Sequence, residues 1–306
     1  MSRLSKIIHL IGCGIRRPRE TASLLRLLAS VMRSAQRKDG DALRTSRETA
    51  NLLNLLASVM RGVQFCCETE FAPQRKHGAR FPEAPNPLLS YFNAHKEGPG
   101  IYKWLHYFDI YHRHFSKFVG HEVHVLEVGI YSGGSLRMWR EYFGKGCRVY
   151  GVDLNKACMA YKDEGIEVFI GDQADRSFWT RVKHAVPTID ILIDDGGHLP
   201  EQQRITLEEM LPYIAPGGVY VCEDIHGLLN TFAAYVQGLA SALNSESPCE
   251  MPEGISGLAC ATSNFQAAIS SIHLYPFVAV IEKREQSLGR LIALKHGTQW
   301  LEFSSR

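Results

Sequence analysis

The chain has 306 residues, with 34 Lys and Arg, 32 Asp and Glu, and a formal net charge of +2. This near balance argues against a nucleic-acid or polyanion binder, and 45% apolar residues argue against a disordered chain. No apolar run reaches the ~18 residues that a membrane span needs. The eight cysteines contain no C-x-x-C pair, so we expect reduced thiols and neither a zinc site nor a disulfide framework.

The charge is unevenly distributed along the chain. Residues 1–70 carry a net charge of +6 and residues 71–306 a net charge of −4. The cysteine usage favours a cytoplasmic protein. The basic first 19 residues leave organelle targeting open as an alternative.

The basic region contains an internal repeat. Residues 19–36 (RETASLLRLLASVMRSAQ) and 47–64 (RETANLLNLLASVMRGVQ) are identical at 14 of 18 positions. Apolar residues recur at helical spacing in both copies, and KDGD at 38–41 is typical of a turn. We expect an N-terminal helical hairpin within 1–70, whose role is packing, oligomerisation, a lid or a membrane-surface helix. Residues 71–100, rich in Pro, Gly, Asn and His, predict a linker.

Short apolar strands alternate with helices over residues 101–306, which we expect to form one domain. The predicted strands are 123–128, 148–154, 166–170, 189–194 and 218–222, and the predicted helices are 136–143, 178–185, 201–214 and 228–243. A further helix over 265–274 and an antiparallel pair of strands at 277–283 and 291–296 complete the series. This alternation predicts an α/β fold with a doubly wound, mostly parallel seven-stranded sheet.

Acidic and glycine-rich segments follow the predicted strands. They are EVGIYSGGS at 127–135, Asp153, GDQ at 171–173, DDGGH at 194–198 and EDIH at 223–226. Ligands of open parallel sheets bind at the carboxyl ends of the strands, and glycine lets the backbone approach them closely. A single acid at a strand end is usually a helix cap or a solvated group. A row of them favours a polyhydroxylated or cationic ligand, a metal ion, or both.

Residues from about 100 to 230 resemble the class I S-adenosylmethionine-dependent methyltransferases. More narrowly, they resemble the metal-dependent sugar O-methyltransferases of macrolide biosynthesis and the related cephalosporin-hydroxylase/rhamnosyl O-methyltransferase group. The motifs that carry this resemblance are VLEVGIYSGGSLRMW (125–139), YGVDL (150–154), IGDQAD (170–175), IDILIDDGGH (189–198) and LPYIAPGGVYVCEDIH (211–226). The resemblance implies a Rossmann-like methyltransferase fold and methyl transfer to a hydroxyl of a sugar or other small molecule in natural-product biosynthesis.

The resemblance also implies a site. Asp195, Glu223 and Asp224 match the ligands of a Mg²⁺ ion, which would lower the pKa of the acceptor hydroxyl. His198 matches the general base of the family. Asp153 would bind the ribose hydroxyls of S-adenosylmethionine. The full set implied for this cofactor is Glu127, Gly129, Tyr131, Ser132, Gly133, Ser135, Asp153, Leu154, Asp172, Gln173 and Asp194.

Other functions remain open at this point. In one alternative, His198 acts alone and the protein is a metal-independent methyltransferase. In another, the methyltransferase fold has no activity and serves as a binding scaffold that works through its helical hairpin. Iron-dependent hydroxylation is not predicted, because the sequence offers no facial triad of two histidines and a carboxylate at a convincing spacing. We expect a small-molecule acceptor with a sugar-like hydroxyl, no nucleic acid and no membrane span, and a homo-oligomer stays open.

Seven of the 13 histidines lie in residues 77–124, including the pairs His112-x-His114 and His121-x-x-His124. These pairs leave a zinc site open, although no cysteine accompanies them. Around them, His106, Tyr107, Tyr111 and His114 lie either over the cofactor or acceptor pocket or in the core. Residues 103–115 (KWLHYFDIYHRHF) also resemble the segment of the family that precedes its first strand. They start with the pair Lys103-Trp104, and the acid that often precedes this pair in the family is missing here.

Overall fold

The computed structural model of the chain describes residues 54–55, 57–63, 65–66, 85–228, 230–253 and 255–299. The described residues before 67 are helical and lie in or just after the second copy of the repeat. The rest of the expected N-terminal hairpin lies outside the described residues. No helix in the described part of the chain is long and apolar enough to cross a membrane. The described residues of 84–226 and 230–306 form one compact unit, which carries all the features that follow.

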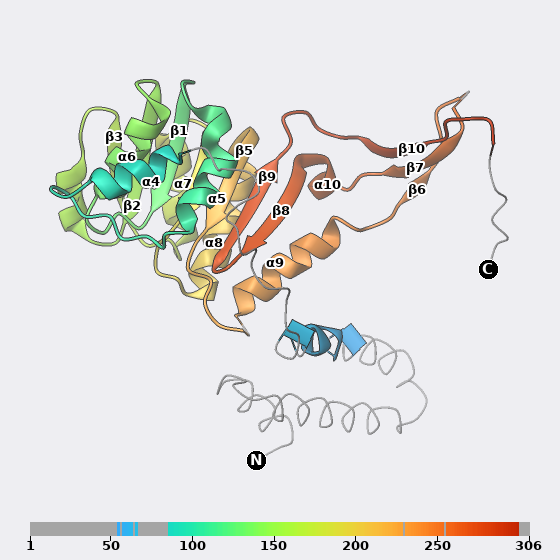
Figure 1. Cartoon of the computed structure of the whole chain (residues 1–306), viewed down its shortest axis with the longest axis horizontal. Helices are drawn as coiled ribbons and strands as arrows, with labels where there is room; N and C mark the ends of the chain where they lie inside the picture. The colour runs from blue at the N-terminus through green and yellow to red at the C-terminus, as the bar shows by residue number, and fades with distance from the viewer. Residues whose placement is uncertain are drawn as a thin grey trace, which may run out of the picture. The chain divides into compact units, whose positions relative to one another are not determined.

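Seven strands form the central sheet of this unit (Figure 1). In chain order they are β1 (Val123–Val128), β2 (Cys147–Asp153), β3 (Ile166–Ile170), β4 (Ile189–Asp194), β5 (Ile214–Cys222), β8 (Ile269–Tyr275) and β9 (Val278–Lys283). Their spatial order is β3-β2-β1-β4-β5-β9-β8, with β1 to β5 parallel and β9 antiparallel to both of its neighbours. The predicted fold class is confirmed. The strand order reverses between β1 and β4, which is where ligands bind in open sheets.

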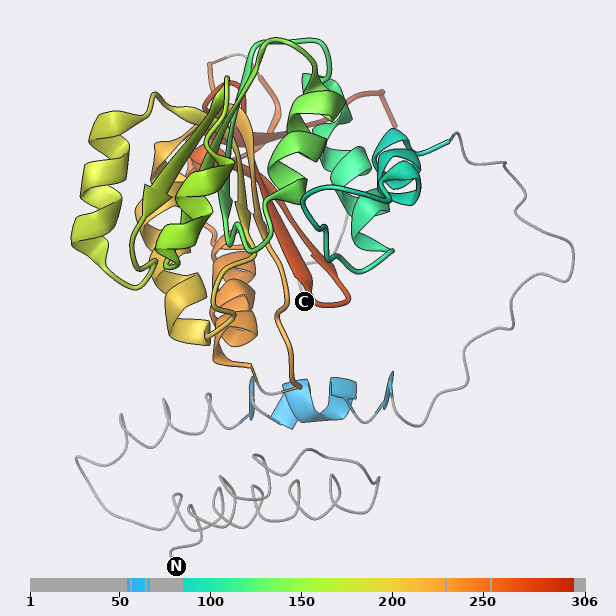
Figure 2. The same cartoon turned by 90° about the vertical axis from the view of Figure 1, so that its left-hand side faces the viewer.

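Helices cover both faces of the central sheet (Figure 2). One face packs against α4 (Pro87–Ala94), α5 (Tyr107–Phe115) and α6 (Gly134–Phe143), the other against α7 (Arg176–Ala185), α8 (Pro200–Met210) and α9 (Thr231–Ala242). Short 3-10 helices lie at Ser116–Phe118, Lys156–Tyr161 and Leu211–Tyr213. Because helices cover both faces, β1 and β4 are buried along nearly their whole length, which explains their continuous apolar sequences.

Helix α4 lies in the stretch 71–100, where the sequence indicates only a linker. The side chain of Asn86 accepts hydrogen bonds from the backbone N–H groups of Leu88 and Leu89, and Pro87 opens the first turn. Leu88 is fully buried in the core on the α5 face. The Asn-Pro pair therefore marks the start of a helix.

The helix expected over 265–274 is wrong for most of its length. The structure has the short helix α10 (Asn264–Ala268), and β8 begins directly after it. A capping box between Ser263 and Gln266 starts α10, but the β-branched Ile269 and the pairing of β8 with β9 end it. Pairing with a neighbouring strand thus overrides the local helical signal.

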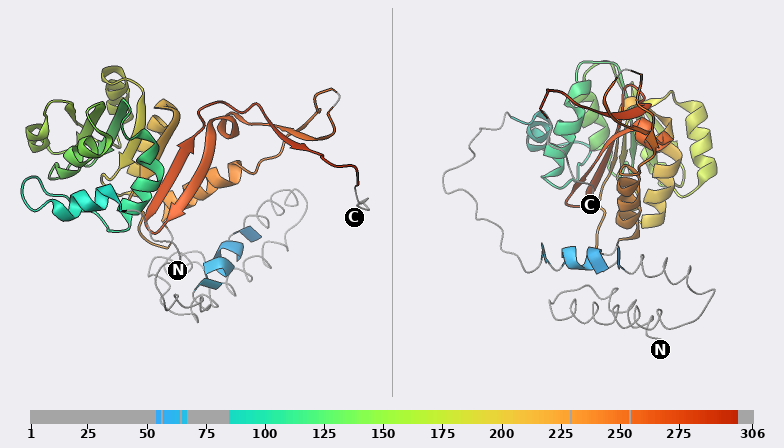
Figure 3. Two further views of the ribbon diagram at one scale, coloured as in Figure 1. Left: turned by 45° about the horizontal axis from the view of Figure 1, so that its top comes forward. Right: turned by 90° about the vertical axis from the view of Figure 1, so that its right-hand side faces the viewer.

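The expected antiparallel pairing of 277–283 with 291–296 is also wrong. The central sheet ends with β8, which takes the edge position beside β9. The last strand, β10 (Arg290–Leu294), pairs instead with β7 (Gly257–Ala261). Together with β6 (Pro248–Cys249) they form a separate three-stranded sheet (Figure 3).

Candidate active site

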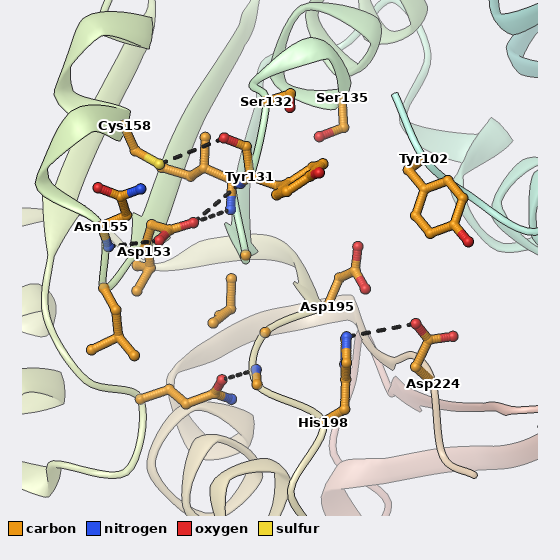
Figure 4. Close-up of a pocket in the computed structure, with 18 of the residues that line it drawn as sticks. Tyr102, Tyr131, Ser132, Ser135, Asp153, Asn155, Cys158, Asp195, His198 and Asp224 are labelled. Carbon is orange, nitrogen blue, oxygen red and sulfur yellow. Dashed lines mark hydrogen bonds and ion pairs between the residues drawn. The ribbon is translucent and has the colours of Figure 1, made fainter. Parts of the chain in front are cut away.

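The carboxyl ends of β1 to β5 border a cavity of about 560 Å³ (Figure 4). The segments that follow these five strands line it, together with residues 100–103 ahead of α5. Figure 4 shows Asp195, His198 and Asp224 on one side of this cavity and Tyr131 and Asp153 on the opposite side. One side of the cavity therefore carries two carboxylates and an imidazole. The opposite side is formed by the loop after β1 and by the carboxylate of Asp153.

The loop after β1 brings the backbone close to this cavity. Gly129 has a φ of +90°, and a Cβ added there would clash with the carbonyl oxygen of Asp195. Gly133, with a φ of +77°, lies at the N-terminus of α6, and a Cβ there would meet the ring of Tyr161. Both positions need glycine for these physical reasons. The loop leads into the N-terminus of α6, whose N–H groups favour an anionic ligand group.

Glu127, near the end of β1, is fully buried next to the cavity and holds the side chains of Ser135 and Trp139 by hydrogen bonds. Ser135 Oγ and Trp139 Nε1 donate hydrogen bonds to its Oε2 atom at 2.8 and 3.1 Å. Its Oε1 atom accepts no hydrogen bond from any residue that the structure describes, and the ammonium of Lys103 lies 3.5 Å away. Burial raises the pKa of the Glu127 carboxyl against the opposing effect of Lys103.

Asp153, at the end of β2, holds the loop after β1 in place. Its Oδ2 atom accepts hydrogen bonds from the backbone N–H groups of Ile130 and Tyr131 at 2.9 and 3.1 Å. Its Oδ1 atom accepts one from the backbone N–H of Asn155 at 2.8 Å. A carboxylate offers about four lone-pair sites, so Asp153 keeps acceptor capacity toward the cavity that it lines.

Most of the residues predicted to bind a cofactor line the cavity: Gly129, Tyr131, Ser132, Ser135, Asp153, Leu154 and Gln173. Glu127, Gly133, Asp172 and Asp194 do not line it. Asp172 accepts a hydrogen bond from the backbone N–H of Ala174 at 2.8 Å. Asp194 is buried and accepts hydrogen bonds from Gln173 Nε2 at 3.0 Å and Tyr220 OH at 3.3 Å. Burial raises the pKa of Asp194 to about 6.

Asp195, His198 and Asp224 come together on the other side of the cavity. One potential ligand atom of each lies within 4.8 Å of those of the other two, and His198 Nε2 is 3.6 Å from Asp224 Oδ2. His198 and Asp224 have φ values of +56° and +53°, which are uncommon for residues other than glycine. With Tyr131, they are three of the four described non-glycine residues with positive φ. Such strain is typical of functional sites.

Glu223, the third residue predicted as a metal ligand, is fully buried and lies outside this group. Its Oε1 atom accepts a hydrogen bond from Tyr111 OH at 2.5 Å, and its Oε2 atom accepts one from Lys103 Nζ at 2.9 Å. Burial raises the pKa of Glu223, and Lys103 opposes this shift. Glu223 is therefore connected to Asp195 through Lys103, which binds both carboxylates.

Lys103 is the site residue that the sequence interpretation missed. Its ammonium donates to Asp195 Oδ2 at 2.6 Å, and its side chain is only 3% exposed. Burial alone would lower the pKa of Lys103, but Asp195 and Glu223 raise it well above the ordinary value, so the side chain stays charged. The position of Lys103 in the segment 103–115 was the only indication that it could belong to the site. No motif spacing predicts its contacts with acids that lie about a hundred residues away in the sequence.

Helix α5 and the residues before it support the acids from behind. Tyr107 OH and Trp104 Nε1 both donate to Asp224 Oδ1, at 2.7 and 3.1 Å. Tyr107, Tyr111, His106 and His114 do not line the cavity itself. Tyr107 and Tyr111 therefore contact the site acids from outside the cavity. His106 bonds to the carbonyl of Pro276 instead, and His114 bonds to Glu282 and Tyr275.

Comparison with known proteins gives the same result as the fold and the motifs. Residues 126–225 match the family model described as a methyltransferase domain. This match runs from the second half of β1 to just past β5 and contains all of the predicted catalytic, cofactor-binding and metal-binding residues. The resemblance to class I S-adenosylmethionine-dependent methyltransferases is thereby confirmed.

Three curated relatives are named as O-methyltransferases. Demethylmacrocin O-methyltransferase of Streptomyces fradiae is 39% identical over 133 residues, which are 40% of this chain and 33% of that protein. Mycinamicin VI 2''-O-methyltransferase of Micromonospora griseorubida is 34% identical over 157 residues, 48% of this chain and 37% of that protein. 8-demethyl-8-alpha-L-rhamnosyl tetracenomycin-C 2'-O-methyltransferase of Streptomyces olivaceus is 31% identical over 209 residues, 61% and 53% respectively. The chain spans between a third and about half of the length of these relatives.

A solved structure is also similar. It is the MycE methyltransferase from the mycinamycin biosynthetic pathway in complex with Mg and SAH. It matches with a TM-score of 0.52 and 26% identity over 65% of this chain and 54% of that chain. A second crystal form of the same complex gives a TM-score of 0.53 at 25% identity, over 80% of this chain and 62% of that chain. The predicted Rossmann-like methyltransferase fold is confirmed.

Proposed function

We propose that this protein is an S-adenosylmethionine-dependent O-methyltransferase that acts on a hydroxyl of a sugar or sugar-bearing small molecule. The observation that carries this proposal is the placement of Asp195, His198 and Asp224 across one cavity from Asp153 and Tyr131. One cavity then has a side for the cofactor and a side for the acceptor. The names of the relatives support a sugar hydroxyl as the acceptor.

The cofactor side of the cavity fits S-adenosylmethionine. Asp153 keeps acceptor capacity for a ribose hydroxyl, and the backbone of Gly129 lines the cavity where the methionine part would lie. Gln173 lines the cavity beyond β3, where the adenine would lie. The volume of about 560 Å³ falls within the usual range for small-molecule sites, and the nearby carboxylates suit a cationic sulfonium.

The acceptor side fits a Mg²⁺ ion held by Asp195 and Asp224. Mg²⁺ prefers oxygen ligands and is commonly bound by one or two carboxylates with water. Such an ion would act as a Lewis acid and lower the pKa of the acceptor hydroxyl. Imidazole suits softer metals, which leaves His198 to take up a proton. Glu223 fits the role of a third ligand less well, because it is fully buried and does not line the cavity.

The residues of the chain then perform the transfer by positioning and by moving one proton. The acceptor oxygen attacks the methyl carbon in line, the sulfonium C–S bond breaks, and the sulfur leaves as a neutral thioether. His198 takes the hydroxyl proton, and Asp224, 3.6 Å from His198 Nε2, stabilises the imidazolium that forms. Lys103 holds Asp195 in its orientation.

Calorimetry with S-adenosylhomocysteine and methyl transfer to O-demethylated, deoxysugar-bearing macrolides test this function. We expect cofactor binding, turnover that stops with a chelator, and a loss of 100-fold or more in kcat for His198→Ala. His226→Ala is the matched control: its ring also lies 3.5 Å from Asp224 but does not line the cavity, so its activity should stay within a few-fold of wild type.

Three outcomes would contradict three different parts of the proposal: the cofactor, the metal ion and the general base. No binding of S-adenosylhomocysteine would overturn the function as a whole. Turnover that survives the chelator would leave a metal-independent methyltransferase. An active His198→Ala variant would show that another group takes the proton.

A further inference from the structure

Three side chains that are far apart in the sequence meet at the C-terminal end of α5. His114 of α5, His273 of β8 and Glu282 of β9 each place a potential ligand atom within 4.8 Å of the other two. We propose that they form a second metal site, separate from the carboxylates of the cavity, that binds Zn²⁺ or a similar divalent transition metal ion. The sequence interpretation found no set of two histidines and a carboxylate, because only the fold brings these residues together.

The type and spacing of these donors favour such an ion. Two imidazoles and one carboxylate form a typical open zinc site, with water as the fourth ligand. Bonds of about 2.0–2.1 Å in a tetrahedron place the donor atoms about 3.3 Å apart. Here His114 Nδ1 lies 2.9 Å from Glu282 Oε1, and His273 Nε2 lies 3.6 Å from Glu282 Oε2. Small shifts of these side chains would reach the required separations.

The hydroxyl of Tyr275 orients His114. His114 Nε2 lies 2.9 Å from Tyr275 OH, so a ring that binds a metal through Nδ1 carries its proton on Nε2 and donates it to this hydroxyl. Ligating histidines are commonly oriented in this way. Ser271 Oγ lies 3.0 Å from both His273 Nε2 and Glu282 Oε2, and a metal ion would replace the hydrogen bonds of this hydroxyl to the two donor atoms. The His273 side chain is 39% exposed, which leaves an entry path from solvent.

The histidine pairs noted in the sequence do not form a zinc site with each other. His112 Nδ1 lies 2.8 Å from Tyr142 OH, and His124 Nδ1 lies 2.9 Å from Tyr150 OH. His114 instead faces the β8–β9 hairpin, and a metal ion there would hold α5 against these two strands. Since Tyr107 and Tyr111 of the same helix bond to Asp224 and Glu223, the ion would also stabilise the support of the candidate active site.

Zinc titration of the metal-free full chain tests this proposal. Calorimetry and metal content after dialysis are measured with millimolar Mg²⁺ present, so that zinc is not taken up by the cavity carboxylates. We expect wild type to retain one zinc ion per chain more than His273→Ala and Glu282→Gln, and to bind it at least tenfold more tightly. His112→Ala, on the same helix, is the matched control and should bind zinc like wild type.

Two further measurements do not depend on enzyme activity. Zinc should raise the melting temperature of wild type and of His112→Ala, but not that of His273→Ala or Glu282→Gln. Co²⁺ in place of zinc should give the visible absorption of a four-coordinate ion in wild type, and this band should be lost in His273→Ala. A wild-type chain that takes up no zinc at micromolar concentration, or equal uptake by wild type and both variants, would overturn the proposal.

Discussion

The ammonium of Lys103 lies 2.6 Å from the carboxylate of Asp195 and connects the segment before α5 to the end of β4. The same ammonium lies 2.9 Å from Glu223 at the end of β5 and 3.5 Å from Glu127 at the end of β1. One buried cation therefore balances carboxylates that come from three neighbouring strands. Its loss should change both the stability of the fold and the response of the protein to metal ions.

Replacing Lys103 with methionine leaves these carboxylates without their buried counter-charge. We expect Lys103→Met to lower the free energy of unfolding by about 3–5 kcal/mol in metal-free buffer, because removing one partner leaves buried charge unpaired. Mg²⁺ should then stabilise the variant more than wild type, since a bound divalent ion restores positive charge beside Asp195. Urea unfolding with and without MgCl₂ measures both effects.

The matched control for this prediction is Lys162→Met. The ammonium of Lys162 is exposed and lies 3.4 Å from Glu167, so its removal should change the free energy of unfolding by less than about 1 kcal/mol. A Lys103→Met variant as stable as wild type without metal would show that the buried carboxyl groups do not need this cation.

Asp153 and Asp172 should differ in their importance for cofactor binding. Asp153 lines the cavity and retains acceptor capacity, whereas Asp172 accepts from the backbone of Ala174 and does not line it. A hydrogen bond to a charged group contributes about 1.5–3 kcal/mol, so Asp153→Asn should weaken binding of S-adenosylhomocysteine by roughly 10- to 100-fold. Asp172→Asn should change it by less than about threefold. Calorimetry with both variants measures these affinities. Equal losses of affinity in the two variants would show that Asp153 has no special role in binding the cofactor.

Gly129 should tolerate no side chain. Gly129→Ala combines a positive φ with a clash against the carbonyl oxygen of Asp195. Gly144→Ala isolates the first effect, since its φ is +95° and no heavy atom lies within 4 Å of the added Cβ. We expect Gly144→Ala to cost about 1–3 kcal/mol in the free energy of unfolding, and Gly129→Ala to cost clearly more. Urea unfolding of both variants provides the comparison, and equal costs would show that the loop moves to accommodate the clash.

The cysteines should react with maleimide at different rates. Burial raises the pKa of the Cys147 thiol to about 12, whereas Cys66 is exposed. Because the thiolate is the reactive form, Cys66 should be labelled at least tenfold faster than Cys147 at pH 8. Mass spectrometry of the labelled peptides measures this ratio, and similar rates at both positions would contradict the burial of Cys147.

The same shift gives a pH dependence of stability. The folded state keeps the Cys147 proton up to about pH 12, while an unfolded thiol loses it near pH 8.5. The folded state therefore binds more protons in this interval, and the free energy of unfolding should fall as the pH rises from about 9 to 12. Below pH 8 the contribution is fully present. Cys147→Val should show a weaker decline between pH 8 and 10 in urea unfolding.

The strands and their ends were predictable from the sequence for a clear physical reason. The predicted ranges 123–128, 166–170 and 189–194 agree with β1, β3 and β4. Strands β1 and β4 are covered on both faces, and burial of this kind produces continuous apolar runs. The edge strand β3 is only partly buried. Parallel topology then brings their carboxyl ends together, which is why the meeting of Asp195 and Asp224 followed from the order of elements alone.

The features that the sequence did not predict depend on competition between distant segments. Both β8 and β10 contain apolar residues, and either could in principle pair with β9 at the edge of the central sheet. In the structure β8 pairs with β9, and β10 pairs with β7. The buried position of Lys103 and the meeting of His114 with Glu282 likewise arise from contacts across more than 90 residues. No local period or motif spacing contains such information.

The central sheet is complete at Lys283, where β9 ends. The small sheet contains β10, which follows β9 in the chain, and β6 and β7, which lie in the chain between α9 and α10. In it, β7 pairs with both β10 and β6. No described residue of these three strands lines the cavity. β10, the last strand in the described part of the chain, therefore pairs with the segment between α9 and α10 and leaves the hydrogen-bond ladder of the central sheet unchanged. Because this small sheet lies outside both that ladder and the lining of the cavity, substitutions in it should leave the architecture of the cavity intact.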